Sequence, residues 1–390
     1  MSRAALLVLA KEVKDNLRDR RTLISALVFG PLFGPLFFAF LVSVMLMRTA
    51  EQLDEALELP IAGAEHAPNL VAFLVEQHVS VQSAPEDAQA AVRDRRHDVV
   101  LIIPRDFGDR LARGEPAAVQ LVADSADSRT AKHVARARAL LGGYAGRLAQ
   151  LRVLARGLSP GLTAPLVIED VDVATPAARS VLVLGMMTYF ILFAVLIGGL
   201  YLAADTTAGE RERGSLEPLL TLPVARSALV VGKLGATCTF MLASLAISLT
   251  AFAVSLPFVP FERLDMVANF GPGVALSAFA IMIPFVLFGA ALLTVVASFT
   301  RSYKEAQTYL SLVLVVPTLP IAVASLYGLK PVEWMMLVPS LSQHLLITEL
   351  IKGAHVPALL VLTSVTSTLA LGLALAWIAT RLYRREAILG

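Results

Sequence analysis

Charged side chains are scarce in this sequence. Asp, Glu, Lys and Arg make up 16% of the 390 residues and apolar side chains 56%, whereas a soluble domain carries about 25% charged residues. The scarcity is uneven, because charge concentrates in residues 1–22 and 48–179 and almost disappears over long stretches elsewhere. This distribution excludes an ordinary soluble protein and indicates a lipid-soluble part joined to a water-soluble part.

Cysteine and several catalytic motifs are also missing. The single cysteine, Cys238, excludes an intramolecular disulfide, and its apolar surroundings are typical of a small buried side chain. No H-E-x-x-H arrangement occurs, which excludes that class of zinc protease. The nearest approach to a phosphate-binding G-x-x-x-x-G-K-[ST] loop is Gly232–Lys233, but Ser227 replaces the first glycine and Leu234 the hydroxyl residue. We therefore expect no ATP site on this chain.

The sequence contains several long apolar runs. A helix needs about 20 apolar residues to cross a bilayer, and six runs qualify: 23–47, 181–203, 229–256, 272–299, 307–327 and 357–379. Lys233 is the one Asp, Glu, Lys or Arg in these windows, and its position near an end predicts that it extends toward the head groups. The first run contains Gly30, Pro31, Gly34 and Pro35, which predict a kink or close packing. Because this run is long and starts only after residue 22, we expect no cleavable signal peptide.

The short connections predict the orientation. Segments 1–22, 204–228, 300–306 and 380–390 together carry fourteen Lys and Arg, whereas loops 257–271 and 328–356 together carry three. Positive residues favour the cytoplasmic side of short loops. We therefore expect both termini in the cytoplasm and the long insert, residues 48–179, on the outer side of the cell membrane.

The insert has the pattern of a small α/β domain. Residues 98–104, 117–124 and 166–174 read as strands, and 127–157 as a long helix that Asp127 or Ser128 could cap. The insert carries 15 Lys and Arg against 18 Asp and Glu, which excludes a basic nucleic-acid-binding face. The predicted fold is thus a helical membrane protein with six spans and an inserted extracytoplasmic α/β domain. The sequence leaves two functions open for this domain. It could recognise a substrate or an envelope partner, or it could be a folded spacer that dimerises.

The connection between the second and third runs is the most informative stretch. The second span can continue as a helix through "GERER", and Gly214 then ends it. Ser215 is well placed to cap a new short helix with Glu217 near its positive end, and Pro223 ends that helix. The pattern predicts a sharp corner at 210–222 followed by a short amphipathic helix at the membrane surface.

A family resemblance rests on this stretch. "ERERGSLEPLLTLPVARSALVVGK" resembles the loop of ABC type-2 export permeases, in which an E-x-E-x-G-[ST]-x-E core precedes leucines, a proline, an arginine and a later Gly-Lys. The positions that match are Glu210, Glu212, Gly214, Ser215, Glu217, Pro223, Arg226, Gly232 and Lys233. Residues 98–127 resemble the insert of the subgroup with a large domain after the first span. "SFTRSYKEAQTYLSLVLVVPTLP", at 298–320, is similar to the sodium-efflux-type branch.

The resemblance implies the partners and the energy source. Members of the family pair two permease subunits, identical or related, with two ATPase subunits, which bind ATP and Mg. The chain would then be a transporter subunit without a cofactor or metal of its own. The 210–222 corner would couple it to the ATPase, through Glu210, Glu212, Gly214, Ser215, Glu217, Pro223, Arg226 and Lys233. The amphipathic segment 1–22, with Leu6, Leu9, Val13 and Leu17 on one side, would lie along the membrane and add a second contact, or serve only as a basic anchor.

The cargo is left open by the sequence. Residues 328–356 read as two short helices separated by Pro339, which would lie at the outer interface or re-enter the membrane. They carry the weak substrate-binding candidates Glu333, His344 and Glu349. The branch resemblance suggests sodium, whereas the absence of carboxylates from the predicted spans favours an amphipathic or lipophilic compound. A receptor or scaffold without transport activity is the alternative function.

Overall fold

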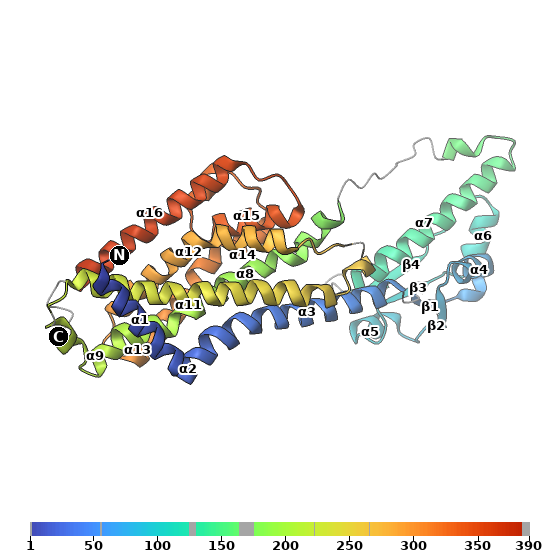
Figure 1. The fold of residues 1–390 in the computed structure, drawn as a ribbon. Coiled ribbons are helices and arrows are strands. Elements are labelled where there is room, and N and C mark those ends of the chain that lie inside the picture. The colour runs from blue at the N-terminus through green and yellow to red at the C-terminus, as the bar shows by residue number, and fades with distance from the viewer. Residues whose placement is uncertain are drawn as a thin grey trace. The chain divides into compact units, whose positions relative to one another are not determined.

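The computed structural model describes residues 2–54, 57–124, 130–163, 175–221, 223–264 and 266–383 (Figure 1). The chain divides into two compact units. The first combines Met1–Ala50 with Val173–Gly390, and the second is Glu51–Asp172.

Among the described residues of the first unit, six helices are long and apolar enough to cross a membrane, as predicted. They are Ile24–Arg48, Val183–Glu212, Arg226–Phe258, Pro272–Ser298, Tyr303–Tyr327 and Ala358–Leu382. In the labels of Figure 1 these are η1–α3 (Ile24–Phe29, Gly30–Asp54), α8–α9 (Pro176–Ala204, Glu210–Glu212), α11 (Arg226–Ser255), α12 (Pro272–Ser298), α13–α14 (Tyr303–Val315, Leu319–Tyr327) and α16 (Ala358–Leu382).

The glycines and prolines of the first span fit a close approach to α8. A Cβ on Gly30 would lie 2.8 Å from Ile197 Cγ2, and one on Gly34 would lie 3.0 Å from Phe190 Cβ. The short helix α2 (Arg20–Leu23) and the π-helical turn η1 precede this contact, and Pro35 is accommodated inside α3. The predicted close packing is therefore present.

The second span, α8, lies at the centre of the unit. Its residues Ile191, Leu192, Val195 and Leu196 are fully buried, and it packs against α11, α12 and α15 (Leu341–Lys352). A Cβ on Gly198 would lie 2.6 Å from Ser244 Cβ of α11, so the two helices meet backbone to backbone. Small residues allow such contacts, which stabilise helix pairs in lipid.

In the connection between the last two spans, α15 is largely buried, whereas Trp334 and Leu337 of the preceding helix are exposed. The helix η8 (Glu333–Leu337) and α15 lie on either side of Pro339, as the sequence predicts. Gln343 is fully buried in α15. Its side chain accepts from the Ser340 N–H at 2.7 Å and donates to Thr368 Oγ1 of α16 at 3.1 Å. These bonds satisfy the polar atoms of Gln343 inside the protein. Among the described residues, the buried His344 Nδ1 and Thr348 Oγ1 of the same helix have no hydrogen-bond partner.

The second unit contains a four-stranded sheet with helices. Strands β1 (Glu58–Ala62), β2 (Ser80–Ser83), β3 (Val99–Ile102) and β4 (Gln120–Ala123) are arranged in the order β2-β1-β3-β4. β1 is parallel to β2 and β3, and β4 is antiparallel to β3. The helices are α4 (Pro68–Glu76), α5 (Ala88–Arg93), α6 (Phe107–Ala112) and α7 (Thr130–Leu154).

The sequence predictions for this unit are partly confirmed. β3 and β4 lie within the predicted strands 98–104 and 117–124, and α7 lies within the predicted helix 127–157. Ala137 of α7 packs in a core with Leu59, Leu74 and Leu101, whereas Leu151 of the same helix is exposed. The predicted strand 166–174 and the proposed caps Asp127 and Ser128 lie outside the described residues.

Candidate functional site

The second span ends at the predicted corner. After α8 the helix widens into the π-helical turn η4 (Asp205–Gly209) and continues as α9 to Glu212. Gly214 follows with φ +67°, a left-handed conformation that glycine adopts at least cost. The Ser215 N–H donates to the Glu210 carbonyl at 3.0 Å, which closes the helix end. The predicted break at Gly214 is confirmed.

Beyond the break, one local prediction is wrong. The next helix, α10 (Leu216–Leu220), has Ser215 as its preceding residue, but the Ser215 side chain makes no capping bond to it. Ser215 Oγ instead donates back to the Glu210 carbonyl at 3.2 Å, because Ser215 is in the helical rather than the extended conformation that capping requires. Ser215 therefore stabilises the end of α9. Pro223 is exposed in the turn before α11, and Glu217 belongs to α10.

A buried ion pair lies directly beneath the corner. Lys233 of α11 pairs with the Glu210 carboxylate, and its Nζ also donates to the Thr206 carbonyl at 2.7 Å. Lys233 is 2% exposed and Glu210 is 7% exposed. The expectation that Lys233 extends toward the head groups is wrong, since a carboxylate and a carbonyl on α8–α9 hold it inside the bundle. The π-helical turn leaves the Thr206 carbonyl available to it.

The N-terminal helix α1 (Arg3–Arg18) is a further part of this site. α1 packs against α11, and Gly232 is the crossing point, because a Cβ there would lie 2.6 Å from Val8 Cβ. Glu12 and Asn16 are both 4% exposed, and the charges of Glu12 and Glu210 influence each other.

The apolar side of α1 is only partly covered. Leu6 is 52% exposed and Leu17 is 47% exposed, whereas Val13 packs against the buried cluster around Phe240. α1 therefore buries polar residues and leaves two of its leucines exposed.

Two more helix ends meet at the same place. The buried Tyr383, which follows α16, has its ring centroid 5.8 Å from Lys233 Nζ, and its carbonyl accepts from Arg226 Nη1 at 3.4 Å. The Tyr383 phenol is hydrogen-bonded to the Ser298 side chain at the end of α12, and burial raises the pKa of this phenol above its ordinary value. The C-terminal end of the last span thus joins the site.

The corner also holds the turn between α12 and α13. Arg211 Nη1 and Nη2 donate to the carbonyls of Thr300 at 2.8 Å and Ser298 at 3.2 Å, at the C-terminal end of α12. Glu212 accepts from the Tyr303 N–H at 2.6 Å, at the start of α13. A cation at a helix C-terminus and an anion at a helix N-terminus are the favourable arrangement. The three consecutive residues 210–212 therefore connect α11, α12 and α13.

The three weak substrate candidates lie in different environments. Glu333 is exposed at the start of η8, and Glu349 pairs with Lys352 at 2.5 Å. His344 is 3% exposed, its Nδ1 has no hydrogen-bond partner, and burial lowers its pKa to about 4. Within the described ranges, no group of three or more His, Cys, Asp and Glu could hold a metal ion.

The sequence reasoning missed Glu12, Asn16, Arg211, Tyr383 and Gln343. Arg211 stands inside the quoted motif, and the spacing of Glu12 and Asn16 puts them on one side of a helix, so a signal existed for these three. Tyr383 and Gln343 carry no local signal, because their roles depend on contacts with residues far away in the sequence.

The fold and this site define a multi-pass membrane protein whose second span ends in a charged corner joined to several other helix ends. The chain belongs to the ABC-2 family of transporter proteins, whose pattern matches residues 20–381. It is the permease subunit of an ABC transporter. A relative is the ABC transporter permease protein NatB of Bacillus subtilis (strain 168), with 27% identity over 364 residues that cover 91% of this chain and 92% of the relative.

Proposed function

We propose that this permease exports its cargo with energy from ATP hydrolysed on a separate ATPase chain, and that the 210–222 corner transmits the force. The observation that supports this is the linkage at residues 210–212. Glu210 pairs with Lys233 of α11, Arg211 binds the end of α12, and Glu212 binds the start of α13. A displacement of the corner by a partner would thus move three spans together, since its bonds to them are short and charged.

The assembly follows from the same proposal. Two ATPase copies with bound ATP and Mg contact two permease subunits, either two copies of this chain or this chain and a related permease. The excess of Lys and Arg in segments 1–22, 204–228, 300–306 and 380–390 supports a cytoplasmic position for both termini and for the corner. Residues 48–179 are then extracytoplasmic, on the outer side of the cell membrane.

An amphipathic or lipophilic cargo fits the spans at least as well as sodium. The acidic groups near the end of the second span are already engaged, since Asp205 pairs with Arg213 and Glu210 with Lys233. Ser244 and Thr294 donate their hydroxyl protons to the carbonyls of Ala194 and Ala290. Among the described residues, the buried hydroxyls of Thr188 and Ser248 have no hydrogen-bond partner. An ion path through lipid generally uses embedded ionisable groups.

The corner provides the decisive experiment. We expect the ATPase chain to co-purify with this permease, and Gly214→Val or Glu217→Gln to abolish transport-linked ATP hydrolysis while the protein remains inserted. Gly214 has φ +67°, which a β-branched residue cannot adopt without strain, although its surroundings have room for a Cβ. The control is Gly271→Val, because Gly271 also has room for a Cβ but has φ −78°. Wild-type coupling in both corner variants would contradict the proposal.

A receptor or scaffold is the second candidate, and the separate core of the Glu51–Asp172 unit favours it. This function needs no partner ATPase and no intact corner. Vesicles that contain both subunits, tested with a panel of cations and amphiphiles, separate the two candidates, since a scaffold would move none of them.

A further inference from the structure

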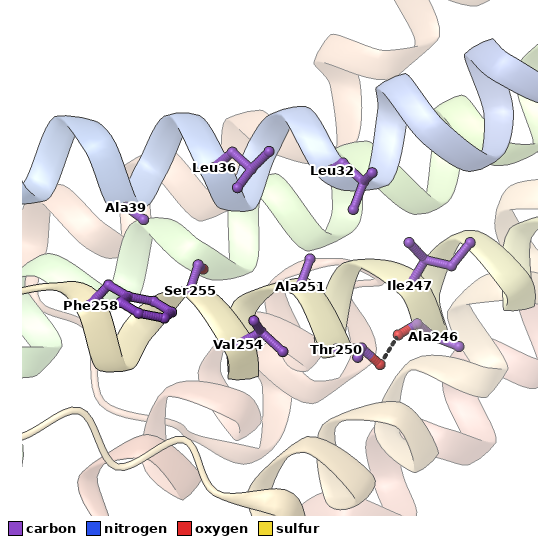
Figure 2. Close-up of a pocket in the computed structure, with 10 residues that line it drawn as sticks. All are labelled: Leu32, Leu36, Ala39, Ala246, Ile247, Thr250, Ala251, Val254, Ser255 and Phe258. Atoms are coloured by element: carbon purple, nitrogen blue, oxygen red, sulfur yellow. Dashed lines mark hydrogen bonds between the residues drawn. The ribbon is translucent and has the colours of Figure 1, made fainter.

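A groove with an almost entirely apolar lining lies between the first and third spans (Figure 2). It has a volume of about 650 Å³, and small side chains on both helices leave the space open. Its walls include Leu32, Leu36 and Ala39 of α3 and Ala246, Ala251 and Val254 of α11. The Thr250 hydroxyl in the wall donates to the Ala246 carbonyl of its own helix at 2.8 Å, so it offers little polarity to an occupant. Hydrocarbon is the chemistry that fits such a space.

The length of the groove matches one bilayer leaflet. It follows α11 from Ala246 to Phe258, and at about 1.5 Å per residue this span measures about 18 Å. Half of the hydrocarbon core is about 15 Å thick. A hydrocarbon chain from one leaflet can therefore lie along most of the groove.

A polar pocket adjoins the groove at the C-terminal end of α11. It has a volume of about 540 Å³, shares Phe258 with the groove and is lined by Glu262 and Arg263 of helix η6 (Phe261–Leu264). Both charged residues are exposed. One cation and one anion suit a zwitterionic head group, because Arg263 can bind a phosphate and Glu262 an ammonium group. The apolar groove and the charged pocket are thus adjacent, in the same arrangement as the acyl chain and the head group of a phospholipid.

A helix from a second copy of the chain fits this space less well. A helix about 10 Å in diameter could insert only side chains into a groove of about 650 Å³, whereas a hydrocarbon chain can lie inside it. A helix also supplies no counter-charges for Glu262 and Arg263 at a defined end. A single lipid chain meets both conditions.

We propose that α3 and α11 hold one membrane phospholipid with an amine-bearing zwitterionic head group, its acyl chain in the groove and its head group on Arg263 and Glu262. This lipid is a bound component of the permease and is distinct from the exported cargo. The inference does not rest on the export proposal, since it concerns binding by the inserted chain.

The test uses the full chain in nanodiscs that contain equal amounts of phosphatidylethanolamine and phosphatidylglycerol, followed by gentle release and native mass spectrometry. We expect one phosphatidylethanolamine to remain on each chain. Ala251→Phe fills the groove and Arg263→Gln removes the phosphate partner, and each should lower the retained fraction at least five-fold. Because Arg263 is exposed, its substitution should leave the fold intact.

Matched controls separate this site from general lipid adhesion. Leu276→Phe changes an exposed apolar residue of α12, and Lys330→Gln removes an exposed cation elsewhere, so both should retain the lipid. Equal loss in the controls, full retention in Arg263→Gln, or a preference for phosphatidylglycerol would overturn the proposal. Dissociation of a dimer by Ala251→Phe, without loss of a lipid, would also overturn it and assign the groove to a second copy.

Discussion

The buried pair of Lys233 and Glu210 allows a quantitative prediction for the free energy of unfolding. Lys233→Met leaves the Glu210 carboxylate 7% exposed, without its cation and influenced by the negative charge of Glu12. Removal of one partner from a buried pair costs about 3–5 kcal/mol. Glu210→Gln should cost less, because Lys233 keeps the Thr206 carbonyl at 2.7 Å and gains an amide oxygen.

The assay is thermal unfolding of the purified chain. With an unfolding entropy of about 2.1 cal/mol/K per residue, about 1 kcal/mol corresponds to about 1 °C for 390 residues. Lys233→Met should therefore lower the midpoint by roughly 4–6 °C. The double variant Glu210→Gln/Lys233→Met should recover most of this loss, since no charge is left buried alone. Lys352→Met, which breaks a pair at the partly exposed Glu349, is the control and should cost less than about 1 kcal/mol. Additive losses in the double variant, or an unchanged midpoint for Lys233→Met, would refute the reasoning.

Three further predictions concern other contacts. Gly232→Ala places a Cβ 2.6 Å from Val8 Cβ, so α1 should shift away and the transporter's coupled ATP hydrolysis should fall. Val8→Gly in the same chain removes the contacted Cβ and should partly restore it. Glu212→Gln keeps an acceptor for the Tyr303 N–H but loses the negative charge at the start of α13. The free energy of unfolding, measured by thermal unfolding, should fall by only about 0.3–1 kcal/mol. A larger loss would mean that the carboxylate has another partner. The pKa of His344 falls from 6.5 to about 4 in the folded protein, so between pH 6.5 and pH 4 the unfolded state binds one proton more than the folded state. The free energy of unfolding should therefore decrease by about 3 kcal/mol as the pH falls from 6.5 to 4. His344→Gln should flatten this part of the stability profile.

Local patterns were sufficient for the spans and the corner. Runs of about 20 apolar residues form helices in lipid because each backbone polar group must be satisfied within its own segment. The break at Gly214 was predictable because φ +67° is a local property of one residue. The Ser215 prediction failed for a related reason, since its capping role depended on a backbone angle that the preceding helix end determines.

Burial was harder to predict. The two short helices within 328–356 were predicted, but the contact of the buried Gln343 in α15 with Thr368 of the next helix was not. In the second unit, β3 and β4 were recognised because they lie in the apolar stretches 98–104 and 117–124. β1 and β2 were not recognised and are defined by their pairing.

The sequence by itself determined that this protein crosses a membrane and that its second span ends at a glycine followed by a short helix, because hydropathy and backbone preference act over a few neighbouring residues. Only the tertiary structure decided that Lys233 turns inward to Glu210, that α1 buries Glu12 rather than its leucines, and that residues 211 and 212 bind two other helix ends. Those contacts depend on which helices pack side by side. A charged residue at a helix end can face water, lipid or a partner, and its neighbours in space decide among them.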